Sequence, residues 1–123
     1  MIVNKNDIIE VKLSEFDFTD SIITKIYFEA NLTDLVIEVD YFWTELEKGE
    51  RIEFKFCNCL NFNYDMPKNL YELNNGELNW SQFTIQKIEF ENSEFPKLNI
   101  YTYDYMKPLV SVQFADLTFS RKE

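Results

Sequence analysis

Apolar and polar residues alternate with a period of two along most of this chain, and this pattern constrains its fold more than any other feature. One example is L-V-I-E-V-D-Y-F-W, residues 35–43, in which most of the apolar side chains share one parity. Side chains two apart on a strand point to the same face, so the pattern predicts half-buried β-strands. The stretches that carry it are residues 8–13, 22–28, 35–43, 52–64, 83–91, 98–105 and 109–119. We therefore expect an all-β protein in which the run Ile8–Leu13 adds an outer strand.

Three of these stretches recur in the same order in the second half of the chain. I-T-K-I-Y-F-E (23–29) matches I-Q-K-I-E-F-E (85–91) at five of seven positions. L-V-I (35–37) is followed later by L-N-I (98–100), and I-E-F-K-F (52–56) by V-S-V-Q-F (110–114). One meander cannot bury its apolar face alone. The repeat predicts two three-strand antiparallel meanders, packed as a β-sandwich or a flattened barrel.

The length of 123 residues is that of one domain. We expect the first meander at about 21–64, a linker at 65–82 and the second meander at about 83–120. The linker contains Pro67 near the start, and Asn75-Gly76 near the end, of an otherwise helix-compatible stretch. This placement predicts one short helix within residues 65–76.

The segment Cys57-Asn58-Cys59 raises the question of a metal or redox site. The chain has no histidine and no further cysteine pair, whereas zinc takes about four nitrogen, sulfur or oxygen ligands. Residues two apart on a strand lie about 6.5–7 Å apart at Cα, at the limit of disulfide geometry. The second repeat has Ala115 in the place of Cys57 and is one residue shorter, which indicates a β-bulge. We predict reduced wall residues, with no metal and no cofactor.

The formal charge of −10 disfavours nucleic-acid and anionic-membrane partners and favours a basic protein partner. The alternative is that acidity serves solubility alone. The absence of histidine removes Ser-His and Cys-His nucleophiles, and two glycines are too few for phosphate-cradling loops. A non-enzymatic protein is therefore expected. The first residues show no signal-peptide pattern and no apolar run is long enough to span a membrane, so the expected compartment is the cytoplasm.

Two groups of residues are candidates for a protein-binding surface. Acidic side chains gather in turn-like segments, and tyrosines share one face of the predicted strand at 98–105; tyrosine offers contact area at low entropic cost. The alternatives are that the carboxylates are only solvated and that the tyrosines pack under the helix or along a sheet edge. The candidates are Asp17, Asp20, Glu45, Glu47, Tyr101, Tyr103 and Tyr105.

The segment Phe18-Thr19-Asp20-Ser21-Ile22-Ile23-Thr24-Lys25-Ile26 resembles the F-H-D-S-x-I-x-x-I opening of certain small bacterial proteins, some of them immunity proteins of polymorphic toxin systems. Those proteins continue with a strand similar to Leu35–Tyr41 and then one similar to Phe56-Cys57-Asn58. The resemblance covers about the first half of the chain. Thr19 stands where the pattern has histidine, so no role of that histidine transfers. The resemblance implies a small cytosolic all-β protein that neutralises a toxin.

We therefore expect a non-enzymatic, acidic protein-binding module, with a toxin-neutralising immunity protein as the leading hypothesis. Its partner would be a basic toxin domain, for example a nuclease. The first alternative is a small-ligand-binding β-barrel lined by Phe and Tyr. The second is a structural domain that forms homo-oligomers through an exposed edge strand.

Overall fold

A computed structural model describes residues 5–29, 32–41, 50–65, 83–103 and 106–122. Within these ranges the chain forms one helix and six strands. The elements are α1 (Lys5–Ser14), β1 (Ile22–Glu29), β2 (Asp34–Tyr41), β3 (Glu50–Tyr64), β4 (Ile85–Glu91), β5 (Lys97–Thr102) and β6 (Val110–Lys122). All strand pairs are antiparallel, in the order β1-β2-β3-β6-β5-β4. The all-β prediction is confirmed.

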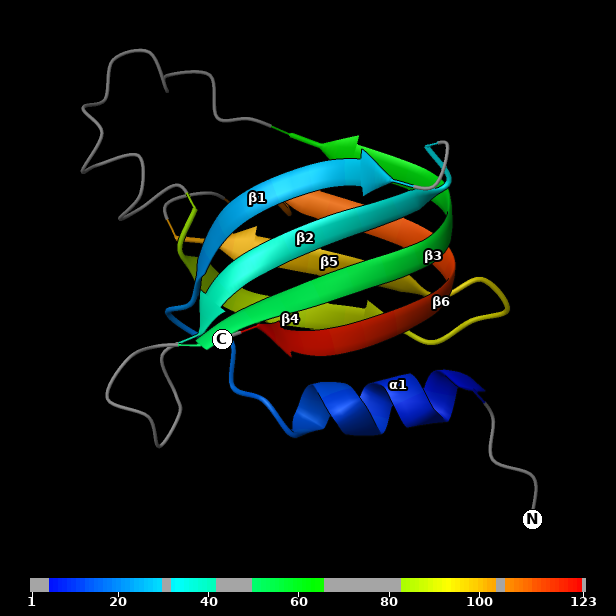
Figure 1. Ribbon diagram of the computed structural model, residues 1–123, viewed down its shortest axis with the longest axis horizontal. Helices are drawn as coiled ribbons and strands as arrows, with labels where there is room; N and C mark the ends of the chain where they lie inside the picture. Colours follow the sequence, from blue (N-terminus) through cyan, green and yellow to red (C-terminus); the bar gives the residue numbers. More distant parts are fainter. Residues whose placement is uncertain (1–4, 30–31, 42–49, 66–82, 104–105, 123) are drawn as a thin grey trace.

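The two long strands belong to both layers of the fold. The first half of β3, up to Phe56, pairs with β2 on one side and with the C-terminal half of β6 on the other. The second half of β3, from Cys59, pairs with the N-terminal half of β6, which also pairs with β5. Figure 1 shows the sheet folded over, with β1 and β2 in one layer and β4 and β5 in the other. The sandwich-like form is thus one continuous, unclosed sheet whose inner faces make the core.

The two halves are related by an approximate twofold axis, and they correspond to the two copies of the sequence repeat. Strands β1, β2 and β3 of the first half are the equivalents of β4, β5 and β6, and each half runs from its edge strand to the centre of the sheet in the same order. The outer strands share an irregularity, because β1 shifts register between Ile23 and Lys25, and β4 shifts between Ile85 and Lys87. These are equivalent positions of the repeat, so the likeness extends to backbone detail.

The two edge strands meet at one corner of the molecule, which we call the clasp. The amide of Ile23 donates to the carbonyl of Phe83 at 3.0 Å, and the amide of Ile85 donates to the carbonyl of Ser21 at 2.7 Å. The two bonds are equivalents of each other under the approximate twofold axis. Among the described residues, the bridge between Ile22 and Thr84 is where these two edges of the sheet pair (Figure 1).

The symmetry is broken at the Cys-Asn-Cys segment of β3. The pairing with β6 passes over Leu60 between Cys59 and Asn61, which confirms the predicted bulge. Asn58 adopts the left-handed conformation, at φ 54°, and its amide donates to the carboxylate of Asp34 at 3.1 Å. Leu60 has the sequence parity of Phe54 and Phe56, yet it lies on the other face, because an irregular residue exchanges the two faces of a strand. Leu60 is 52% exposed, and Cys59 packs against the core instead.

The run Ile8–Leu13 forms part of α1, so the predicted outer strand is wrong. Ile9 is buried in the core and Leu13, about one turn later, packs against it. Val11 points away from the core and is 59% exposed. This is the periodicity of a helix, in which side chains four apart share a face and side chains two apart do not.

The N-terminal end of α1 is anchored to the turn between β4 and β5. The side-chain amide of Asn6 donates to the carbonyl of Ser93 at 2.6 Å and to the side-chain oxygen of Asn92 at 3.1 Å. Asn92 in turn donates to Asp7 at 3.2 Å, an acidic residue in the first turn, where the helix dipole favours it. Figure 1 shows α1 along the margin of the sheet formed by β6 and β4. The helix thus packs along this margin and contributes Ile9 to the core.

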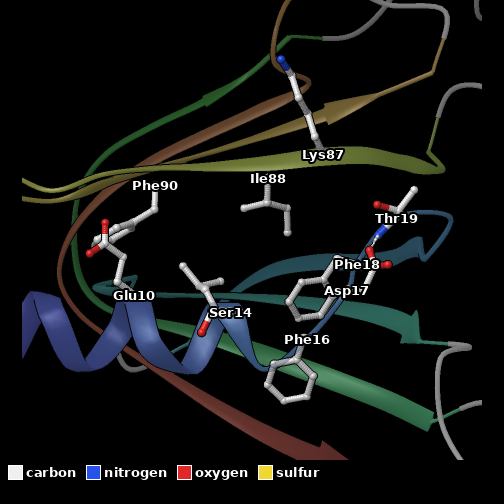
Figure 2. A pocket seen from close by; sticks show the side chains of 10 residues that line it. Glu10, Ser14, Phe16, Asp17, Phe18, Thr19, Lys87, Ile88 and Phe90 are labelled. Carbon is white, nitrogen blue, oxygen red and sulfur yellow. Dashed lines mark hydrogen bonds between the residues drawn. The ribbon is translucent and has the colours of Figure 1, made fainter.

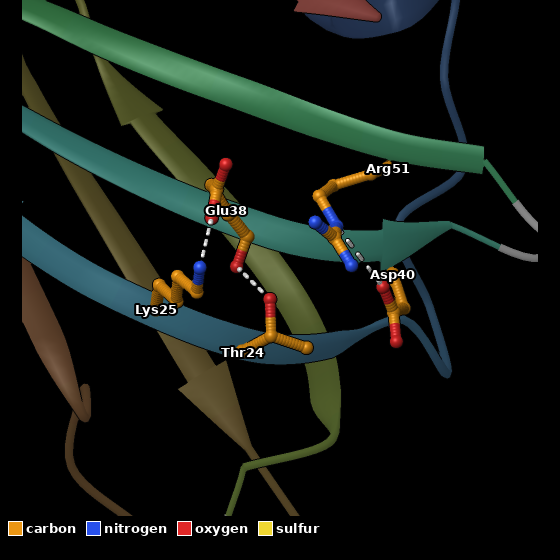
Figure 3. A network of polar contacts seen from close by, with 5 residues as sticks. All are labelled: Thr24, Lys25, Glu38, Asp40 and Arg51. Atoms are coloured by element: carbon orange, nitrogen blue, oxygen red, sulfur yellow. Dashed lines mark hydrogen bonds and ion pairs between the residues drawn. The ribbon is translucent and has the colours of Figure 1, made fainter. Parts of the chain in front are cut away.

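The outer face of the first layer carries pairs of opposite charge (Figure 3). Lys25 lies 3.8 Å from Glu38, and Arg51 lies 4.0 Å from Asp40. The hydroxyl of Thr24 donates to the carbonyl of Glu38 at 3.1 Å. Cross-strand pairs of this kind help to fix register. The pair of Arg51 and Asp40 is exposed and contributes little stability, whereas the Glu38 side chain is only 4% exposed.

The helix predicted within residues 65–76 lies outside the described residues apart from Asp65. The description ends there and resumes at Phe83. In the described part of the chain, no helix is long and apolar enough to cross a membrane.

Candidate functional site

Two of the predicted binding residues, Asp20 and Tyr103, meet although 83 positions separate them. The Tyr103 hydroxyl donates a hydrogen bond to Oδ1 of Asp20 at 2.8 Å. This bond is the main reason that the pKa of Tyr103 lies above its usual value; burial and the charges of Asp20 and Asp17 act in the same direction. The contact joins the start of the first meander to the end of β5.

Local backbone geometry fixes the two carboxylates of this site. Oδ1 of Asp17 accepts the amide of Thr19 at 3.1 Å, and the amide of Asp17 donates to the Tyr41 hydroxyl at 3.3 Å. Asp20 is left-handed, at φ 71°, a conformation that Asp adopts at lower cost than most residues. Its amide donates to the carbonyl of Ile85 at 2.8 Å. Both carboxylates are exposed at positions set by the fold.

The F-T-D-S segment that carries the resemblance has a structural role in this chain. Phe18 is buried and packs edge-on against Phe54, with ring centroids 4.9 Å apart. Ser21 is buried and its carbonyl belongs to the clasp. The segment therefore positions Asp20 by fastening the chain on both sides of it.

Tyr101 forms a second cluster on β4 and β5. Nζ of Lys87 lies 4.6 Å from the centre of the Tyr101 ring and 3.1 Å from Oε1 of Glu89. The hydrogen bond from Lys87 lowers the pKa of Glu89. Burial, followed by the influence of Glu89, raises the pKa of Tyr101. We refer to Asp17, Asp20, Tyr101 and Tyr103 as the Asp–Tyr corner.

A pocket of about 350 Å³ adjoins the Asp–Tyr corner, between α1, the segment that follows it and β4 (Figure 2). Figure 2 shows Ile88 and Phe90 directed from β4 toward the helix, whereas Lys87 points away from it. The walls are half apolar and half polar, and the polar wall residues are Glu10, Ser14, Asp17, Thr19 and Lys87. The apolar wall residues include Leu13, Phe16, Phe18, Ile88 and Phe90.

The structure brings together only part of the predicted site. Asp17, Asp20 and Tyr103 lie near one another, Asp17 also lines the pocket, and Tyr101 contacts the lysine beside it. Glu45, Glu47 and Tyr105 lie outside the described residues. The pocket was not predicted, because a strand was expected where α1 forms a wall. The spacing of Ile9, Leu13 and Phe16 fits one face of a helix and could have indicated α1. The spacing of Ile9, Val11 and Leu13 fits one face of a strand equally well.

Both thiols of the Cys-Asn-Cys segment are free and half-buried. Burial raises the pKa of Cys57, and the carboxylates of Asp34 and Asp116 add to the effect. Burial likewise raises the pKa of Cys59. Among the residues that the structure describes, no three His, Cys, Asp or Glu side chains gather as metal ligands would. The geometry favours two unreactive thiols at a bend in β3.

We expect both thiols to react with iodoacetamide more slowly than an unhindered thiol at pH 8. The thiolate is the reacting form, and a raised pKa reduces its population. The rate should rise with pH through a midpoint above the usual thiol value of about 8.5. The Cys57→Ser and Cys59→Ser variants, each with one thiol, assign the two midpoints by mass spectrometry. Reaction of either thiol at pH 7 as fast as in the urea-unfolded protein would contradict this expectation.

The comparisons with known proteins bear on the fold. No family model and no curated protein matches the chain. A crystal structure of an uncharacterized protein from Neisseria gonorrhoeae is similar, with a TM-score of 0.60 over 85% of this chain and 93% of that one, at 20% sequence identity. At this identity the similarity shows a shared fold and nothing about activity.

Proposed function

We propose that this chain is a non-enzymatic protein-binding module that holds a basic partner at the Asp–Tyr corner. The observation that carries the proposal is the Asp20–Tyr103 hydrogen bond beside a pocket with a partly apolar wall. Interfaces commonly combine an apolar anchor in a pocket with a rim of tyrosine and charged groups. The carboxylates of Asp17 and Asp20 supply the rim, and Phe16, Phe18 and Ile88 supply part of the pocket wall.

The net charge of −10 supports a basic partner. A field of this sign attracts a cationic protein from a distance and raises its association rate, most strongly at low salt. The most specific form of the proposal is an immunity protein that neutralises a basic toxin domain in the cytoplasm. It rests on the resemblance of residues 18–26 to the opening of such proteins.

The first test is co-expression with the protein encoded by the adjacent gene in the native host. We expect that protein to arrest growth when expressed alone, and this chain to restore growth and to co-purify with it. If the adjacent protein is harmless, or if growth stays arrested when both are present, the toxin-neutralising form is wrong.

The second test addresses the corner itself. Asp17→Asn with Asp20→Asn removes two charges and keeps side chains that accept hydrogen bonds and tolerate a left-handed backbone. The matched control, Asp40→Asn with Glu94→Gln, removes the same charge elsewhere. We expect the association rate with the co-purified partner to fall about tenfold for the corner variant and less than twofold for the control. Equal losses would refute a local role for the corner, and an affinity unchanged between low and high salt would refute an electrostatic one.

A second candidate function is small-ligand binding, which the pocket volume favours. About 350 Å³ is at the lower end of the volumes of ligand pockets. An apolar compound that binds there should shift the amide signals of Ile88 and Phe90 in an NMR titration. Enlarging Ile88 to Trp should abolish that binding, whereas a partner held mainly by the carboxylates would retain part of its affinity.

A further inference from the structure

The two carboxylates in the wall of the pocket beside α1 lie at its opposite ends. Figure 2 shows Glu10 at the end where Phe90 lies and Asp17 at the end where Thr19 lies, with Ile88 between them. Both acidic residues are exposed, so a solute can reach each of them from solvent. A ligand that contacts both carboxylates must therefore extend across the pocket over Ile88.

The apolar side chains of the pocket are fixed in place by the core. Phe18 is buried in the core cluster, and Leu13, Phe16 and Ile88 pack against that cluster. The rings of Phe16 and Phe18 are stacked, with centroids 5.2 Å apart. This part of the wall is formed before any ligand binds, and it offers a surface that methylene groups cover favourably.

The two carboxylates attract a cation that the described part of the chain does not supply. Lys87 lines the pocket but points away from it, and its Nζ lies 3.1 Å from Oε1 of Glu89. Arg121 lies 5.3 Å from the centre of an aromatic ring of the wall without lining the pocket. Within the described ranges, neither Glu10 nor Asp17 forms an ion pair. The net charge of −10 adds to the attraction for a cation.

We propose that this pocket binds a linear aliphatic diamine or polyamine. One ammonium group pairs with Glu10 and another with Asp17, and the methylene chain between them covers the apolar wall. Such amines are protonated at neutral pH, because the pKa of an alkylammonium group such as that of lysine is about 10.4. A lysine or arginine side chain of a partner protein carries a single cation and meets only one of the two carboxylates, which favours the free diamine.

The proposal names a ligand class for the small-ligand function described above and rests on that function. It does not depend on a protein partner at the Asp–Tyr corner. Binding at two points depends on the length of the spacer between the two cations. The affinity is greatest when the spacer matches the span between the two carboxylates, and it falls when the spacer is shorter or longer. Chain length is therefore the variable that tests the geometry.

The probes are α,ω-diamines with about three to eight methylene groups, titrated into isotope-labelled protein while the amide signals are followed by NMR. We expect saturable shifts of Glu10–Thr19 and Lys87–Phe90, and binding at least about fivefold tighter at one chain length than at the shortest. Magnesium ion controls for charge without hydrocarbon, and 1-hexanol controls for hydrocarbon without charge. Equal shifts of these signals by magnesium, or an affinity that does not depend on chain length, would overturn the proposal.

The 1-hexanol titration separates the ligand class from the function on which it rests. If 1-hexanol binds in the pocket and no diamine does, small-ligand binding stands and the diamine is wrong. If neither compound binds there, both are wrong.

Single substitutions test the two ends of the pocket. Glu10→Gln and Asp17→Asn each remove one carboxylate and keep the size of the side chain. The matched control is Glu15→Gln, which removes the same charge from an exposed residue that does not line the pocket. We expect each end variant to bind the best diamine at least about fivefold more weakly and to lose the preference for chain length, and the control to bind within about twofold of the unsubstituted protein. Equal weakening by Glu15→Gln would refute the two-ended site.

Discussion

Replacing Ile9 with Asp should reduce the free energy of unfolding by about 4 kcal/mol, a large part of the 5–15 kcal/mol typical of a small domain. Ile9 is 2% exposed, within the core cluster. The substitution removes the apolar contacts of Ile9 and places a carboxyl group in an apolar site. Urea unfolding followed by circular dichroism measures the change.

The matched control is Val11→Asp, two residues away. Val11 is 59% exposed on the far face of α1, so we expect a change within about 0.5 kcal/mol. On a strand, Ile9 and Val11 would share one face and the two substitutions would cost similar amounts. Similar losses for both variants would therefore contradict the helix.

This contrast shows why the strand assignment at residues 8–13 failed. Apolar residues at positions i, i+2 and i+4 satisfy the strand period, but i and i+4 also share a face of a helix. Over so short a run the pattern alone does not distinguish the two. Tertiary contacts decide between them: Ile9 is buried in the core, and Asn6 anchors the end of the helix to the turn at Asn92 and Ser93.

The strands themselves were predictable because their pattern is long and repeated. The order within each half follows from the predicted meanders, because consecutive strands pair, whereas the joining of the two halves through β3 and β6 was not predicted. The sharing of the long strands between both layers was not predictable, because it depends on where β3 and β6 bend. The clasp was not predictable either, because its hydrogen bonds join backbone groups, which no side-chain pattern indicates.

The candidate site was predictable only in its residue types. Acidic residues in turns and tyrosines on one strand face pointed to Asp20 and Tyr103 separately. Their contact depends on the clasp, which brings the start of β1 beside the end of β5. Lys87 received no weight in the sequence, because a lone lysine on a strand is ordinarily a solvated residue. Its contacts with Tyr101 and Glu89 arise only from the pairing of β4 and β5.

Substituting Leu117 with Ala should lower the free energy of unfolding by about 3 kcal/mol, whereas Leu60→Ala should change it by less than about 0.5 kcal/mol. The two leucines hold equivalent positions in the repeat. They differ in the structure because Leu117 pairs with Phe56 and is 2% exposed, whereas Leu60 is the extra residue of the bulge and is 52% exposed. Urea denaturation measures both changes, provided that the slope of the unfolding free energy against urea concentration is the same in each variant.

A third variant identifies the cause of the difference. Cys59 already pairs with Phe114, which is the equivalent of the pair between Leu117 and Phe56. Deleting Leu60 makes β3 the same length as its repeat in β6 and should leave Cys59 in this position. Because Asn58 is already left-handed and hydrogen-bonded to Asp34, the bend can survive without the extra residue. We expect the deletion variant to fold, and Cys59→Leu in that background to be more stable than the deletion alone, because a larger apolar side chain then fills a core position. If Leu60→Ala costs as much as Leu117→Ala, the extra residue does not turn Leu60 outward, and the bulge lies elsewhere in β3.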